Sequence, residues 1–345
     1  MKTKHNPLAI ASREAVANAV RSIEAASFEN PYSGRFEHER VEEANATLLD
    51  QAFFSEPLTD YAVGFRDDAD LDAALEFYAP AVPVNRRFSY AVMDNSEEFL
   101  TDANDERPIG ADFKQVEYTS SKIDAKTLNR GLQIALDLDE IDGIPNWEEY
   151  YTQKLIRRIK RNSLKRAVAL LSAQATNSAV TWDTTAGKDP DLDTLTLLIT
   201  AADKSGVRPN RVGYGDTAWA KRMLAHRAQT TAGGFGSSSL TPDALAGFLG
   251  VDGVQVTSSR YTSSSTAKTQ IVANLVLLFL AESGVDTEDP SNIKRFSSMG
   301  NAEQGGGAFQ VYSQRVSAKR HIIAVGQYEL TKITSTLGIY KQTVS

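Results

Sequence analysis

Residues 146–179 read NWEEYYTQKLIRRIKRNSLKRAVALLSAQATNSA, and they carry the pattern of one long helix that divides the chain in two. Asn146 stands three residues before Glu149, and this spacing predicts a capping box at the start of the helix. No Gly or Pro interrupts the segment. One stripe of the helix is apolar and should face a core; it contains Trp147, Tyr151, Leu155, Ile156, Ile159, Leu164, Ala167, Val168 and Leu171.

The opposite face of this helix carries only positive charge. No acidic residue lies between Tyr150 and Trp182. A one-sided charge of this kind is either a solvated surface or a contact surface for something acidic. The cations are Lys154, Arg157, Arg158, Lys160, Arg161, Lys165 and Arg166.

The composition excludes several classes of protein. At 345 residues and 41% hydrophobic residues, the chain is long enough for about two domains with substantial cores. Acidic residues exceed basic ones, 44 against 37, so the surface as a whole does not favour nucleic acid. The chain has no cysteine, which rules out disulfides, thiolate metal ligands and a thiol nucleophile.

No targeting or membrane segment is apparent. The N-terminus lacks the apolar run of a signal peptide, and the most apolar segment, Ile271 to Ala281, is about half as long as a membrane helix requires. That segment is better interpreted as part of a buried strand over Gln270 to Leu280. We expect a soluble protein, made in the cytoplasm, with no membrane partner.

The first part of the chain is expected to be an arm and a lead-in. Residues 1–50 have a helical pattern with too little apolar bulk for a domain. Residues 51–84 mix apolar and turn residues, with a short helix at 71–77 and an extended segment around Pro80 and Pro83.

A period of two then predicts a long β ribbon. Alternating apolar residues occur at Phe88, Tyr90 and Val92, at Val116 and Tyr118, and at Leu132, Ile134 and Leu136. The tip of this ribbon, residues 94–112, is acidic, with the single base Arg107. Its acids are Asp94, Glu97, Glu98, Asp102, Asp105, Glu106 and Asp112. A lone hairpin is at best marginally stable in water, so the ribbon needs a surface to lie on.

After the long helix, helices and strands alternate. Capping and breaking residues predict helices that begin near Asp191, Asp216 and Pro242, and the segment 257–269 is predicted to be a loop. Extended segments are predicted at 210–214, 254–256, 270–280, 309–316 and 321–328, and at the C-terminus.

One motif resembles a nucleotide site. Residues 213–218, GYGDTA, fit GxGxxA between a strand and a helix. However, Asp216 would place a carboxylate where the pyrophosphate must bind, and no strand ending in an acid follows at the required distance. We therefore interpret the motif as an ordinary strand-turn-helix junction.

Metal and catalytic motifs are also incomplete. Asp189, Asp191 and Asp193 resemble the start of a calcium loop, but the glycine and closing glutamate are missing, so helix capping is the favoured interpretation. The four histidines are dispersed, and His226 near a helix end needs no catalytic role. We predict no catalytic, cofactor or metal residues and no enzyme activity.

The order of these elements resembles the major capsid protein of tailed bacteriophages. The resemblance covers nearly the whole chain and includes the passage PNRVGYGDTAWAKRML at 209–224. It implies an α+β fold with an N-terminal arm at 1–50, a lead-in at 51–84 and an extended loop at 85–137. A peripheral domain with the spine helix would follow at 138–182, an axial α/β domain at 183–318, and strands returning to the peripheral sheet at 319–345.

The resemblance also implies a function. A chain of this family would self-assemble through hexamers and pentamers into an icosahedral virion shell around double-stranded DNA, and assembly would take place in the host cytoplasm. Separate scaffolding and portal proteins are expected partners, because residues 1–50 leave little room for a fused scaffolding domain. Two alternatives remain: an encapsulin-like cellular nanocompartment shell and, from a different class, a nucleotide-binding α/β enzyme.

The charge pattern then predicts a contact between subunits. The acidic tip could lie over the basic helix of a neighbour, at Lys154, Arg157, Arg158, Arg161 and Lys165. The rival use of these cations is weak, non-specific contact with packaged DNA inside the shell.

Overall fold

The computed structural model describes residues 54–64, 71–94, 106–107, 109, 112, 121–229, 232–264, 266–282, 290–298 and 308–345. The expected N-terminal arm lies outside these residues, as do Val116 and Tyr118 of the predicted ribbon. Four of the acids assigned to its tip also lie outside them: Glu97, Glu98, Asp102 and Asp105. The elements below all belong to the unit Ser55–Ser345.

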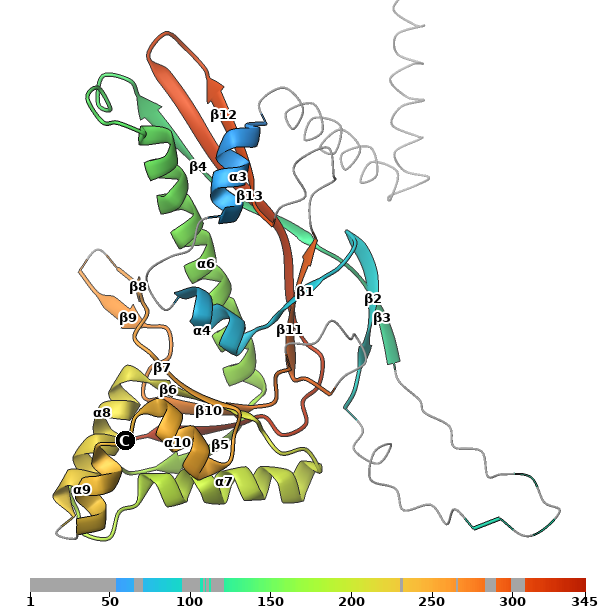
Figure 1. Ribbon diagram of the computed structural model, residues 1–345, viewed down its shortest axis with the longest axis vertical. Coiled ribbons are helices and arrows are strands. Elements are labelled where there is room, and N and C mark those ends of the chain that lie inside the picture. The colour runs from blue at the N-terminus through green and yellow to red at the C-terminus, as the bar shows by residue number, and fades with distance from the viewer. Residues whose placement is uncertain are drawn as a thin grey trace, which may run out of the picture. The chain divides into compact units, whose positions relative to one another are not determined.

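The long helix is the element against which several others pack. Helix α6 spans Trp147–Gln174, which confirms the predicted helix, and it runs beside β4, β13 and α4 (Figure 1). It ends at Gln174 rather than near Ala179, because Thr176–Val180 forms strand β5, which pairs in parallel with the distant β14, Tyr340–Val344. That pairing satisfies backbone groups that a longer helix would have used internally.

The predicted capping box is wrong. Asn146 adopts a left-handed backbone conformation, with φ 53° and ψ 36°, and its side chain makes no capping hydrogen bond. Glu148 and Glu149 still lie in the first turn, where negative charge favours the N-terminal end of the helix dipole.

The first sheet is organised around the long strand β13, Arg320–Ile333. The strand order is β1-β11-β13-β12, and β4 also pairs with β13 in antiparallel register, from Arg320 opposite Asp137 to Glu329 opposite Leu128. The other strands are β1 (Ala81–Pro83), β4 (Leu128–Asp137), β11 (Ile293–Ser298) and β12 (Gln310–Arg315).

The apolar stripe of α6 packs against this sheet. Leu155, Ile156 and Ile159 share a buried cluster with Ile323 and Val325 of β13. Two short helices also pack against α6. Helix α3 (Glu56–Gly64) joins the same cluster, and α4 (Leu71–Tyr78) covers α6 further along; of the two, only α4 was expected from the sequence.

Among the described residues, the second leg of the ribbon ends earlier than the sequence pattern suggested. Its paired legs are β2, Arg87–Val92, and β3, Ser121–Lys126, in antiparallel register. The segment 132–136, expected to belong to the second leg, instead lies in β4 and pairs with β13. The alternation of Leu132, Ile134 and Leu136 therefore marks a sheet strand with one face on the α6 core.

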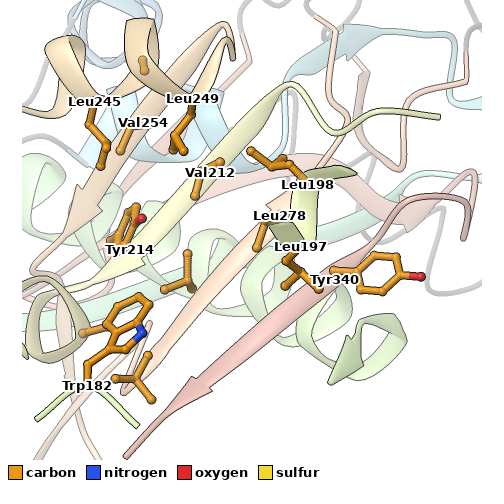
Figure 2. Close-up of a cluster of buried hydrophobic side chains, with 14 of the residues drawn as sticks. Trp182, Leu197, Leu198, Val212, Tyr214, Leu245, Leu249, Val254, Leu278 and Tyr340 are labelled. Atoms are coloured by element: carbon orange, nitrogen blue, oxygen red, sulfur yellow. The ribbon is translucent and has the colours of Figure 1, made fainter. Parts of the chain in front are cut away.

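The second sheet has the order β5-β14-β10-β6-β7. Its inner strands are β10 (Leu275–Phe279), β6 (Arg211–Gly215) and β7 (Gly253–Thr257). Four helices accompany it: α7 (Pro190–Ser205), α8 (Asp216–Ala228), α9 (Ala232–Ser238) and α10 (Pro242–Leu249). Figure 2 shows the core between sheet and helices, where Trp182, Leu198, Tyr214, Leu245 and Leu278 meet.

Two details of this region differ from expectation. The buried strand expected at 270–280 is confined to Leu275–Phe279, and the segment 257–269 contains a small hairpin of β8 (Arg260–Thr262) and β9 (Lys268–Gln270). The C-terminal residues contribute to both sheets: β13 lies in the first, and β14 lies in the second between β5 and β10.

Candidate functional site

The cations proposed as a contact surface lie along α6. Lys154, Arg158, Arg161 and Lys165 are exposed, and Arg157 is half-buried. Two of them contact aromatic rings: Lys154 Nζ lies 4.1 Å from the Tyr150 ring centre, and Lys165 Nζ lies 3.7 Å from that of Tyr261. Both lysines are exposed despite these ring contacts, so they remain accessible to an acidic partner.

The basic face is less continuous than the sequence pattern indicated. Lys160 is buried, and its Nζ lies 2.7 Å from an Asp72 carboxylate oxygen of α4. Arg166 turns toward the first sheet, where its Nη2 lies 2.8 Å from Glu329 Oε1. Both cations were assigned to the charged face, and both instead serve the packing of α6 inside the chain.

Asp94 of the acidic tip is engaged within its own chain. Its Oδ1 accepts hydrogen bonds from the Thr336 backbone N–H at 2.7 Å and from the Thr336 hydroxyl at 3.0 Å. Glu106 and Asp112 are exposed. Among the described residues, Asp94 and Asp112 form no ion pair with Lys154, Arg158, Arg161 or Lys165.

A buried carboxylate forms a polar cluster that the sequence did not predict. Glu329 of β13 is only 1% exposed, and it accepts hydrogen bonds from Ser163 and Arg166 of α6 and from Gln327 at 2.8 to 3.0 Å. Because the partners come from α6 and β13, this cluster fixes the helix on the sheet. Glu329 lies on the same face of the strand as the buried Val325 and Gln327, but nothing in the local sequence distinguishes it from a solvated glutamate.

Arg130 lies beside this cluster, and the sequence did not predict its place there. It lies on β4 opposite Gln327, and its Nε is buried with no hydrogen-bond partner. Burial and the nearby charge of Arg166 lower the pKa of Arg130, and Glu329 partly opposes this effect. Arg130 is only half-buried, so part of its guanidinium remains in contact with water.

The glycines of the nucleotide-like motif have a packing role. A Cβ on Gly213 would lie 2.3 Å from the Tyr78 hydroxyl oxygen, and a Cβ on Gly215 would lie 1.8 Å from the backbone oxygen of Ala273. Asp216 begins α8, with Gly215 at the cap position, and its carboxylate lies 2.6 Å from Arg260 Nη2. The interpretation as a strand-turn-helix junction is confirmed, although Asp216 is not the cap.

The three aspartates of the calcium-like sequence have separate partners. Asp189 caps α7 by accepting from the backbone N–H groups of Asp191 and Leu192. Asp191 is buried against Arg222, and Asp193 accepts a hydrogen bond from Trp182 Nε1 at 3.0 Å. Capping is thus confirmed for Asp189, whereas the other two carboxylates have packing roles. Within the described residues, no group of three or more His, Asp or Glu side chains is arranged to hold a metal ion.

In the part of the chain that the structure describes, no helix combines the length and apolar character needed to cross a membrane.

Comparison of sequences gives no relative: no protein-family model matches, and neither does any curated protein. Comparison with solved structures does find similar proteins. The chain is similar to a phage-related protein from Bordetella bronchiseptica RB50, with a TM-score of 0.61 and 17% identity over 85% of this chain and 97% of that one.

Two weaker likenesses have TM-scores below 0.5. One is to the capsid of cyanophage P-SCSP1u, with a TM-score of 0.48 and 9% identity over 78% of this chain and 87% of that one. The other is to the SrpI encapsulin of Synechococcus elongatus PCC 7942, with a TM-score of 0.40 and 11% identity over 77% and 84%. The likeness to the phage-related protein, with its TM-score of 0.61, shows that this chain shares the α+β fold of that protein.

Proposed function

We propose that this chain is the major capsid protein of a tailed phage, and that it assembles through hexamers and pentamers into an icosahedral shell around double-stranded DNA. The observation that carries the proposal is the fold shared with a phage-related protein over 85% of the chain. The order of a β ribbon, a long helix and an α/β region, which first suggested this family, supports it. Its role would be structural rather than catalytic.

The domain assignment follows the same proposal. The extended loop at 85–137 would include the β2–β3 ribbon, the spine helix would be α6, and the axial domain at 183–318 would include the helices α7 to α10. Pairing of β14 with β10 and β5 joins the C-terminal strand to the axial region as well.

Contacts between subunits are proposed to use the charge pattern. Acidic residues of the ribbon tip would meet Arg157, Arg158, Arg161 and Lys165 of a neighbour, with Lys154 at the start of the same helix face. Exposed ion pairs contribute about 1 kcal/mol or less each, so a single pair would matter little. Over a closed shell many such contacts add up, so each one can be weak and still reversible during assembly.

The proposed partners are those of a virion shell. Scaffolding and portal proteins would be separate chains, and packaged DNA would make weak, non-specific contacts with the inner surface. A cellular nanocompartment shell remains the second candidate, because the same subunit architecture would serve a protein cargo.

Electron microscopy and sedimentation of the purified full chain test the proposal. The expected result is closed shells or hexameric and pentameric capsomers, formed without a cofactor. A species of the mass of one subunit, about 38 kDa, under every assembly condition would overturn it. Co-expression with a portal and terminase, or with a cargo enzyme, then separates the two kinds of shell by what becomes enclosed.

A further inference from the structure

Strand β5 is an outer strand of the second sheet, and it lies beside a groove of about 400 Å³. One wall of the groove is formed by β5 and its neighbour β14, and the other wall is formed by helix α7 (Figure 1). The groove therefore combines the edge of a sheet with the flank of a helix.

The outer edge of β5 carries backbone groups that no described strand uses. Thr176 and Val180 bond on the β14 side, as in the hydrogen bond from Thr176 N–H to Ile339 O at 3.0 Å. Residues that bond to one neighbour alternate along a strand with residues that face the other way. Asn177 and Ala179 therefore direct their N–H and C=O groups outward, where no strand of the described part of the chain pairs with them.

This edge lacks the features that usually protect an outer strand. Proteins commonly blunt such a strand with charged side chains, proline or a bulge, because an open edge pairs readily with another chain. Strand β5 reads TNSAV, without charge or proline, and its register with β14 is unbroken from Thr176 to Val180. Asn177 and Ala179 are also exposed. The edge is thus suited to accept a further strand.

The helix wall determines which strand would fit. The residues of α7 that line the groove recur at the spacing of one helix face, and they are Asp193, Thr196, Leu197, Thr200 and Lys204. Short side chains form the middle of this wall, with a carboxylate at one end and an ammonium group at the other. The two charged residues lie about 17 Å apart along the helix, a distance that about five residues of extended chain span.

Helix α7 runs in the direction opposite to β5. Asp193 lies toward the Val180 end, where it accepts a hydrogen bond from Trp182 Nε1. Lys204 lies toward the Thr176 end, because the next residue of the helix, Ser205, lies beside Gly338 at the start of β14. The charges of the helix wall therefore distinguish the two ends of the groove.

We propose that this groove is a docking site for an extended segment of a separate protein, which adds to β5 as a strand and places alternate side chains against α7. In this mode of recognition, backbone hydrogen bonds supply affinity and the pocket beside the edge selects side chains. The fitting segment has small hydroxyl side chains toward α7, a basic residue near Asp193 and an acidic residue near Lys204. A second copy paired through β5 fits less well, since β5 offers no charge to either residue.

The inference goes beyond the proposed function, because it concerns a partner of the subunit and does not depend on shell formation. Its test is the binding of a defined peptide to the purified full chain. The probe is Lys-Val-Thr-Val-Thr-Val-Glu, with a fluorophore at its N-terminus and an amide at its C-terminus. Paired antiparallel to β5, which is the more stable arrangement, it places its lysine near Asp193 and its glutamate near Lys204.

The expected result is saturable binding, measured by fluorescence anisotropy, with slower hydrogen exchange at the Asn177 and Ala179 amides. Ala179→Pro removes only an N–H group that faces away from β14, so the melting temperature should stay unchanged while binding weakens about tenfold. Lys204→Glu should weaken binding about five- to tenfold without touching the edge. Arg227→Glu, which reverses an exposed charge of α8 outside the groove, is the matched control and should bind as the unmodified chain does.

Three results would overturn the inference. One is no saturable binding up to about 1 mM peptide, and another is binding that survives Ala179→Pro or leaves both amides unprotected. The third is a dimer of the unmodified chain, seen by sedimentation without peptide and lost in Ala179→Pro, because it would assign the edge to a second copy. None of these results bears on the formation of closed shells, which tests the proposed function separately.

Discussion

The guanidinium of Arg222 binds both carboxylate oxygens of Asp191, with Nε 2.6 Å from Oδ1 and Nη2 2.8 Å from Oδ2. Arg222 is fully buried, and Asp191 is 3% exposed. The pair joins α8 to the first turn of α7, and His226 Nε2 lies 3.2 Å from the same carboxylate. Helices α7 and α8, which pack beside the second sheet, are therefore joined by charged side chains that are buried from water.

Removing one member of this pair should destabilise the fold strongly. Asp191→Asn leaves Arg222 buried without a counter-charge, which costs about 3–5 kcal/mol of unfolding free energy. Chemical unfolding of the purified chain measures the change. Asp216→Asn is the matched control, because Asp216 forms a pair of the same length with Arg260 on the surface, and its loss should cost about 1 kcal/mol or less. Equal effects of the two substitutions would contradict the distinction drawn from burial.

The same pair should make stability depend on pH in acid. Burial alone would raise the pKa of the Asp191 carboxyl, but His226 and Arg222 outweigh burial and hold the pKa below its ordinary value. A carboxyl of depressed pKa contributes stability that is fully present above its unfolded pKa of about 3.9 and is lost as the pH falls through the folded pKa. The difference in unfolding free energy between the unmodified chain and Asp191→Asn should therefore shrink as the pH is lowered below about 4. A difference that stays constant down to the acid unfolding limit would refute this linkage.

Local patterns in the sequence predicted most elements of the second sheet. The helix at Pro190–Ser205 begins at a capping Asp189 and ends at Gly206, whose φ of 71° is readily adopted by glycine. Its stop and start signals are thus carried by single residues. The capping box at Asn146 failed although the sequence matched, because the left-handed backbone there carries the side chain away from the free N–H groups.

What could not be predicted depends on pairing between distant segments. Thr176–Val180 continues a helical pattern, but its pairing with β14 makes it a strand. The segment 132–136 alternates as a hairpin leg would, and only β13, nearly 200 residues later, decides that it joins a sheet. For the same reason the charge pattern assigned Lys160 to the surface, whereas the fold places it against Asp72 of α4. Charge patterns identify cations, whereas only packing reveals which ones remain available.

The two glycines of the GYGDTA motif should tolerate an added methyl group much less well than a glycine in open space. Gly215→Ala would force its Cβ against the backbone oxygen of Ala273, so we expect a loss of about 1–3 kcal/mol or more in unfolding free energy. Gly247 is an exposed residue of α10 with nothing within 4 Å of an added methyl group, so Gly247→Ala should stabilise the chain by about 0.5–1 kcal/mol. Thermal unfolding of both variants measures these changes in stability. A harmless Gly215→Ala would mean that the glycine is not required for packing.

Charge reversal on α6 should separate the two uses proposed for its exposed cations. Arg158→Glu combined with Arg161→Glu alters side chains that are exposed in the subunit, so its stability should change by no more than about 1 kcal/mol. If the ribbon of a neighbour binds there, empty shells made without DNA should form poorly, as seen by electron microscopy. Normal empty shells that fail only to package DNA would assign this face to the genome.

Glu329 and Arg130 should show opposite and coupled effects on the subunit. Glu329→Gln removes the carboxylate that binds Arg166 and Ser163 in the described part of the chain, and it leaves buried partners without a counter-charge, so we expect a loss of about 3–5 kcal/mol in unfolding free energy. In an Arg130→Gln background that loss should be smaller, because one repelling charge has already been removed. A double-mutant cycle on the unassembled subunit gives the coupling, expected to exceed about 0.5 kcal/mol. Additive effects would show that Arg130 does not share the electrostatic environment of Glu329.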